Sequence, residues 1–170
     1  GCAGYTEPEE LLANPDVELV IIATRSLTHV ANALQALAAG KFVLLEKPIA
    51  MSEGEIEQLR QADRNYPGRL FFLHNHRFEP AIQQILGIAR SGLLGDIIQV
   101  NLRRHHIFSR RGDWQAYLQY GGGQLNNWGP HLIDHALQFL HYRVASVWGE
   151  LKLVASDTIS LDERCCFPEV

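Results

Sequence analysis

The chain has 170 residues, of which 46% are hydrophobic and 20% charged, enough apolar material for one ordinary core or for parts of two small ones. Its formal net charge is -4, with Lys and Arg scattered along the sequence, and no apolar run reaches the roughly 18 residues of a membrane span, so neither nucleic acid nor a bilayer is an expected partner. Three cysteines, at positions 2, 165 and 166, form neither a disulfide framework nor a CxxC metal motif, which favours a soluble protein of the reducing cytoplasm.

The first half of the sequence alternates strand-like and helix-like segments. A short helix is expected over residues 9–13, another over residues 28–39 before a glycine, and a third that Ser52 and Glu55 open as a capping box and that ends near residue 65. Three apolar, strand-sized runs lie around these helices, at residues 17–23, 41–45 and 70–73. Such alternation with short connections predicts a parallel sheet with helices on both faces, the doubly wound α/β arrangement.

The pattern changes near residue 76, where we place a domain boundary. A helix is expected from about residue 79 to residue 91, and another from the triple glycine at 121–123 to about residue 141. Strand patterns and an intervening loop make up the remainder, with strands at residues 97–104, 145–153 and 158–161 and the loop at residues 109–113.

Polar residues follow each of the first three predicted strands. Ligands of open α/β sheets bind at the carboxyl ends of strands, so three such segments at one rim indicate a binding site. They are Thr24-Arg25-Ser26, Glu46-Lys47-Pro48 and His74-Asn75-His76-Arg77. Pro48 restrains the backbone of Lys47, whose ammonium group can hydrogen-bond a substrate hydroxyl; the alternative is a solvated loop lysine.

One face of the last predicted helix is polar. Asn127, His131, Asp134 and Gln138 recur at i, i+4, i+7 and i+11. This stripe has two interpretations, namely the exposed side of an amphipathic helix, or a proton-transfer site built on an imidazole that titrates near neutrality.

The spacing of the histidines also bears on metal binding. His131 and His135 lie one helical turn apart, a spacing that can clamp a metal ion, although the full HExxH pattern is absent. The pairs His74/His76 and His105/His106 are expected to alternate along strands, so that each pair sends one ring to either face and forms no cluster.

Taken in order and spacing, three segments resemble the Gfo/Idh/MocA oxidoreductase family, which includes glucose-fructose oxidoreductase and inositol dehydrogenase. The segments are residues 23–29, Glu46-Lys47-Pro48 and residues 121–134. The resemblance implies a dinucleotide-binding Rossmann domain, here residues 1–75, and a substrate and dimerisation domain, here residues 76–170, with an open, largely antiparallel sheet. It also implies NAD or NADP as cofactor, a sugar, polyol or related hydroxy compound as substrate, and a homo-oligomer.

The resemblance also implies roles for single residues. Lys47 and His131 would meet across one cleft at the substrate carbinol, with Asn127 beside them, and manage the hydroxyl proton while a hydride passes to the nicotinamide. The residues expected to line the cofactor are Thr24, Ser26, His29, Glu46, Asn75 and Arg77.

Two features depart from the family pattern. Asn127 stands where many family dehydrogenases carry Asp, and an amide cannot take up a proton. The sequence also holds no G-x-G-x-x-G phosphate loop, so we expect the 170 residues to belong to a protein about twice as long. An N-terminal leader sequence is compatible with this expectation. Two alternatives therefore stay open, a non-catalytic binding or dimerisation module, and a metal-assisted lyase or hydrolase built on His131 and His135.

Overall fold

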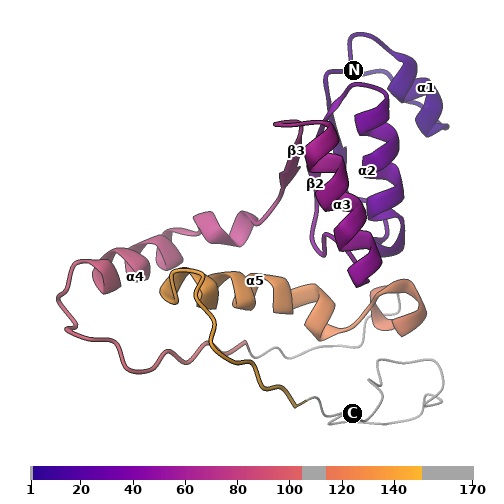
Figure 1. Cartoon of the computed structure of the whole chain (residues 1–170). Helices are drawn as coiled ribbons and strands as arrows, with labels where there is room; N and C mark the ends of the chain where they lie inside the picture. Colours follow the sequence, from indigo (N-terminus) through magenta and orange to yellow (C-terminus); the bar gives the residue numbers. More distant parts are fainter. Residues whose placement is uncertain (1, 105–113, 151–170) are drawn as a thin grey trace. The chain divides into compact units, whose positions relative to one another are not determined.

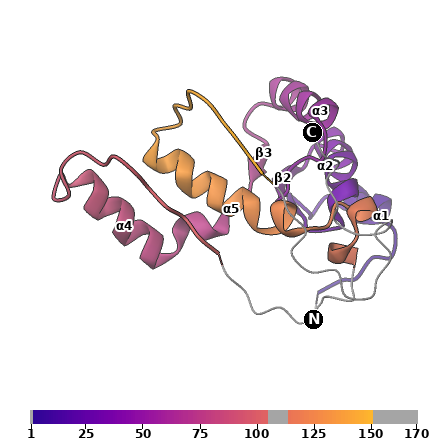
Figure 2. The ribbon, with the colours of Figure 1, turned by 90° about the horizontal axis from the view of Figure 1, so that it is seen from below.

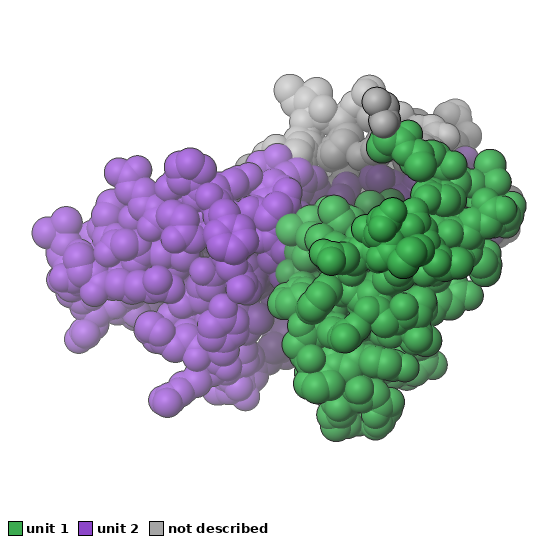
Figure 3. Space-filling model, turned by 90° about the horizontal axis from the view of Figure 1, so that it is seen from above, with its two compact units in different colours: residues 1–73 green, residues 74–170 purple. Residues whose placement is uncertain are grey.

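The computed structural model describes residues 2–104 and 114–150 and divides the chain into two compact units. Unit 1 is Gly1–Leu73 and unit 2 is His74–Val170 (Figure 3). Across these described ranges, no helix is both long and apolar enough to cross a membrane.

Unit 1 is built on a parallel three-stranded sheet. Its strands are β1 (Leu19–Ile22), β2 (Phe42–Leu45) and β3 (Leu70–Phe72), in the order β1-β2-β3. Leu19 lies opposite Phe42 and Val43 lies opposite Leu70, which aligns the carboxyl ends of neighbouring strands. The structure thereby confirms the predicted strands and the α/β, Rossmann-like fold class.

The helices of unit 1 also agree with the sequence pattern. They are α1 (Pro8–Ala13), the 3-10 turn η1 (Ser26–Thr28), α2 (His29–Ala38) and α3 (Glu53–Asn65). The Ser52 hydroxyl caps α3 by accepting a hydrogen bond of 3.2 Å from the Glu55 amide. Gly40, with φ +77°, takes the left-handed conformation that ends α2.

In unit 1, α2 and α3 pack against each other and cover a single face of the sheet (Figures 1 and 2). Because the strand order advances in one direction, both right-handed crossovers place their helices on the same side. The core forms there around Val43 and Leu45 with residues of α2 and α3. Among the residues described in unit 1, α2 and α3 thus cover one face, whereas helices were expected on both, and the other face exposes Leu19, Ile21, Phe42 and Phe71.

The regular secondary structure described for unit 2 consists of helices and 3-10 turns. Its elements are η2 (Asn75–Phe78), α4 (Pro80–Arg90), η3 (Trp114–Ala116), η4 (Leu118–Tyr120) and α5 (Gln124–Phe139). The 3-10 turn η2 packs against both α4 and α5 (Figure 1). The two long predicted helices are thus confirmed.

The predicted strand at residues 97–104 is wrong, because residues 74–104 and 114–150 include no strand. A strand is held by backbone hydrogen bonds to a neighbouring strand, and these residues offer none, so Ile98 is 97% exposed despite the alternating pattern. Residues 145–150 are likewise not a strand, while the remainder of that predicted strand, the strand at 158–161 and the loop at 109–113 lie outside the described residues. The open antiparallel sheet expected for the second domain is accordingly not found in the part of the chain that is described.

Candidate active site

In unit 1, the loops that follow β1 and β2 are neighbours. The register pairs Ile22 with Leu45, and the Glu46 amide continues the ladder by donating a hydrogen bond of 3.0 Å to the Ile22 carbonyl. The Glu46 carboxylate accepts a bond of 3.0 Å from the amide of Lys47. Thr24, Glu46 and Lys47 are thus brought together at one end of the sheet, as expected for residues at parallel strand ends.

His29 connects these two loops. Its ring is only 2% exposed, and its Nδ1 lies 2.8 Å from the Pro48 carbonyl oxygen and its Nε2 3.1 Å from that of Thr24. Both oxygens are acceptors, so a neutral ring donates to one of them and a protonated ring to both. The imidazole therefore ties the loop that carries Lys47 to the loop that carries Thr24. Ser26, in the preceding 3-10 turn η1, is also buried.

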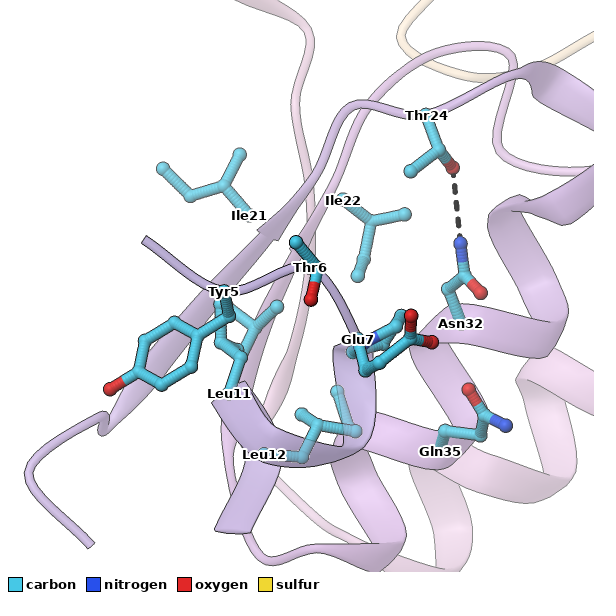
Figure 4. Close-up of a pocket in the computed structure, with 13 residues that line it drawn as sticks. Tyr5, Thr6, Glu7, Leu11, Leu12, Ile21, Ile22, Thr24, Asn32 and Gln35 are labelled. Atoms are coloured by element: carbon cyan, nitrogen blue, oxygen red, sulfur yellow. Dashed lines mark hydrogen bonds between the residues drawn. The ribbon is translucent and has the colours of Figure 1, made fainter. Parts of the chain in front are cut away.

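A hollow of about 230 Å³ lies among α1, β1 and α2, with Thr24 on its lining (Figure 4). The Asn32 amide donates a hydrogen bond of 3.2 Å to the Thr24 hydroxyl, which also lies 2.9 Å from the Thr28 hydroxyl. Apolar side chains, including Leu11 and Leu12, form another part of the lining. Hydroxyl and amide groups beside an apolar wall fit the ribose and flat ring of a nucleotide, whereas the chain carries no glycine loop for its phosphates.

In unit 2, the polar stripe of α5 faces inward. His131 is 3% exposed, and Asp134, His135 and Gln138 are also buried, whereas Ile133 is 54% exposed. Asn127, on the first turns of the helix, is half-buried. The interpretation of this stripe as a solvated amphipathic face is therefore wrong, because side chains of η2 bind it.

Arg77 and Asp134 make the main polar contact between η2 and α5. The Arg77 Nε donates to Asp134 Oδ2 at 3.1 Å, a second guanidinium nitrogen donates to Oδ1, and the Gln138 amide donates to Oδ2 at 3.1 Å. Burial alone would raise the pKa of Asp134, but the bonds and charge of Arg77, with smaller effects of His74 and His135, hold that pKa below its ordinary value. The bond to Asp134 also raises the pKa of Arg77. Of the two residues of η2 that were expected to line the cofactor, Arg77 is thus bound to a carboxylate. The other, Asn75, is exposed at the start of η2.

A cluster of rings surrounds His131. The His76 ring centroid lies 4.0 Å from that of His131 and 5.0 Å from that of Trp128, and the Trp128 and His131 rings are 5.6 Å apart. The guanidinium of Arg104 lies 3.7 Å above the Trp128 ring. The expectation that His74 and His76 alternate along a strand is wrong, because residues 75–78 form a 3-10 turn. His105 and His106 lie outside the described residues.

The contacts of His76 and Trp128 with His131 are not indicated by the sequence pattern, although both residues lie in segments expected near the site. The available signals were Glu79, three residues after His76, and Pro80, which together are typical of a helix start rather than of a strand.

His135 has a structural contact of its own, since its Nε2 lies 3.3 Å from the backbone oxygen of His76. Within residues 2–104 and 114–150, no three His, Cys, Asp or Glu side chains are grouped so as to hold a metal ion. Among the described residues, the metal hypothesis therefore rests on two ligands only, His131 and His135.

The triple glycine sets the start of α5. Gly121 and Gly123 have φ values of +73° and +108°, in the region that side chains disfavour. A Cβ on Gly122 would lie 2.5 Å from the Gln115 carbonyl oxygen and 2.7 Å from that of Tyr117. The loop therefore packs backbone against backbone just before the helix that carries Asn127 and His131.

Two family models match the chain almost end to end. Residues 1–74 match the oxidoreductase family with an NAD-binding Rossmann fold, and residues 82–166 match the GFO/IDH/MocA C-terminal domain. The chain belongs to the GFO/IDH/MocA family. The resemblance drawn from the three sequence segments is confirmed, and so is a nicotinamide dinucleotide as the cofactor of this kind of domain.

Individual relatives agree with this assignment. The trans-1,2-dihydrobenzene-1,2-diol dehydrogenase of Bos taurus is 36% identical over 80% of the chain and 39% of its own length. The scyllo-inositol 2-dehydrogenase (NADP(+)) of Bacillus subtilis is 31% identical over 77% of the chain and 37% of its own length. The crystal structure of an NAD-binding protein from Listeria innocua superposes with a TM-score of 0.74 at 29% identity, over 78% of this chain and 40% of that one. The chain thus spans less than half the length of these relatives.

Proposed function

We propose that the protein is an NAD(P)-dependent dehydrogenase that oxidises a secondary alcohol of a cyclic polyol, a sugar or a related hydroxy compound. The observation that carries the proposal is the buried imidazole of His131 on an inward-facing polar stripe that follows a glycine-rich loop. The names of two relatives, a dihydrobenzene-diol dehydrogenase and an inositol dehydrogenase, support a ring that bears hydroxyl groups.

Residues of unit 1 would hold the cofactor. The Thr24 hydroxyl after β1 and the Glu46 carboxylate after β2 would hydrogen-bond a ribose or amide group, and Ser26 and His29 would shape the turn between them; the contacts of these side chains at one end of the sheet support this role. Asn75 and Arg77 remain candidates for the same role from η2. A nicotinamide bound by these residues would supply the hydride acceptor for oxidation of the alcohol carbon.

The chain's own residues would manage the proton. His131 takes the hydroxyl proton, and the ammonium group of Lys47 donates a hydrogen bond to the same oxygen and stabilises its developing negative charge. The Asn127 amide can orient the hydroxyl by hydrogen bonding but cannot accept its proton. Hydride and proton together account for the two hydrogens that an alcohol loses on becoming a ketone.

Cofactor binding is tested by titrating the purified full-length protein with NADH and NADPH and recording the nicotinamide fluorescence. A saturable change for either nucleotide is expected, and its preference decides between NAD and NADP. No saturable change with either nucleotide would contradict the proposal.

Turnover measurements test the roles of Lys47 and His131. Lys47→Ala and His131→Ala are each expected to lower kcat by about 100-fold or more, because each removes a group that acts on the hydroxyl proton. The double variant should be no slower than about the worse single variant, since residues that act on one step are not additive. His141→Ala is the matched control, because this exposed histidine lies just beyond α5 and should keep wild-type turnover. Additive losses would contradict a shared hydroxyl.

The amide at position 127 favours a second candidate function, a non-catalytic binding or dimerisation module. Saturable nucleotide binding without turnover of any cyclic polyol would support it. For either function we propose that the protein is a cytoplasmic homo-oligomer. Light scattering would measure its mass in solution.

A further inference from the structure

His76 contacts the proposed proton acceptor without belonging to the family motif that suggested it. Its ring centroid is 4.0 Å from that of His131, and its Nδ1 lies 2.6 Å from the Glu79 carboxylate. We propose that His76, anchored by Glu79, is a positioning residue that sets the orientation of the His131 ring. The inference rests on the proposed function in taking His131 as the group that accepts the proton.

The local backbone explains why His76 and Glu79 meet. Residues three apart eclipse one another in a 3-10 turn, and the Glu79 amide donates a bond of 3.2 Å to the His76 carbonyl oxygen. Pro80 then begins α4 with a fixed φ, which holds the turn. An ionised carboxylate only accepts hydrogen bonds, so Nδ1 of His76 is the donor in this pair. The ring of His76 is thereby held in one orientation.

The orientation of His131 is what such a neighbour can control. The terminal torsion of a histidine is broad, and a half turn about it exchanges ring nitrogens with ring carbons. The His76 ring limits this rotation on one side, and Trp128, with Arg104 over its face, limits it on another. An accepting nitrogen that is displaced or turned away loses much of its rate advantage, because proton transfer requires hydrogen-bond geometry.

Replacing Glu79 tests the contact between His76 and His131 without altering either ring. Its side chain is 49% exposed, so its replacement should leave the core of unit 2 intact. Glu79→Gln keeps an oxygen that can accept the bond from His76 but removes the charge, whereas Glu79→Ala removes the acceptor. Glu53→Ala is the matched control, because Glu53 is an exposed carboxylate in the first turn of α3.

The experiment compares turnover and imidazole NMR signals in the wild type and the three variants. Glu79→Ala is expected to lower kcat about tenfold with an unchanged KM for the nucleotide, and to shift the His131 ring signals, which sense the neighbouring rings. Glu79→Gln should restore both readouts to near the wild-type values, and Glu53→Ala should change neither.

Three outcomes would overturn the inference: wild-type turnover in Glu79→Ala, an unshifted His131 signal in that variant, or equal losses in Glu79→Gln and Glu79→Ala, which would point to charge rather than orientation. A wild-type protein without turnover would instead refute the proposed function, and the NMR comparison would still decide the positioning role.

Discussion

At the scale of single residues, the charge of Asp134 links stability to pH. The folded protein holds the pKa of Asp134 below its ordinary value, so its contribution to stability is complete above the ordinary carboxyl pKa of about 4 and is lost as the pH falls through the lowered value. Asp134→Asn should therefore remove part of the acid-side fall in the free energy of unfolding.

The same variant should also be less stable at neutral pH, by about 1 to 3 kcal/mol, because it leaves the partly buried guanidinium of Arg77 without its carboxylate. Urea unfolding at neutral and acid pH measures both effects. Asp63→Asn, which removes an exposed carboxylate of α3, should leave the stability at neutral pH unchanged. An acid-side slope of Asp134→Asn identical to that of the wild type would contradict the pairing.

At the scale of elements, alanine substitutions at two glycines, Gly122 in the loop before α5 and Gly87 inside α4, are expected to have opposite effects. Gly122→Ala should destabilise the protein by about 1 to 3 kcal/mol, because the new methyl group would meet the backbone oxygens of Gln115 and Tyr117 before α5 begins. Gly87→Ala should instead stabilise it by about 0.5 to 1 kcal/mol, since Gly87 lies inside α4 with nothing near its added Cβ. Thermal unfolding of both variants checks the signs, and a neutral Gly122→Ala would show that the loop does not pack as described.

At the scale of the whole molecule, the two faces of the sheet in unit 1 should differ in sensitivity. Leu45 is fully buried beneath α2 and α3, so Leu45→Ala should cost about 2 to 5 kcal/mol. Phe71 on the other face is 48% exposed, so Phe71→Ala should cost less than about 1.5 kcal/mol. Denaturant unfolding compares the two, and equal costs would mean that the second face is also covered in solution.

Much of unit 1 could be predicted because its signals are local. Apolar runs of strand length, a serine cap at Ser52 and a glycine at the end of α2 act over a few residues, and the three strands and their helices lie where the sequence places them. The order of short motifs along the chain also indicated the family, and the family models match residues 1–74 and 82–166, which include the segments around Lys47 and His131.

The order of residues is enough to group those that share one face of α5, whereas the burial of that face depends on what folds against it. Helical periodicity groups side chains but contains no information on what packs against them, and Asp134 is buried by Arg77, which lies 57 positions earlier. The same reason applies to His76, which the 3-10 turn η2 brings to the ring of His131. It applies also to residues 97–104, whose alternation describes the two faces of a strand but cannot provide the neighbouring strand that its backbone requires.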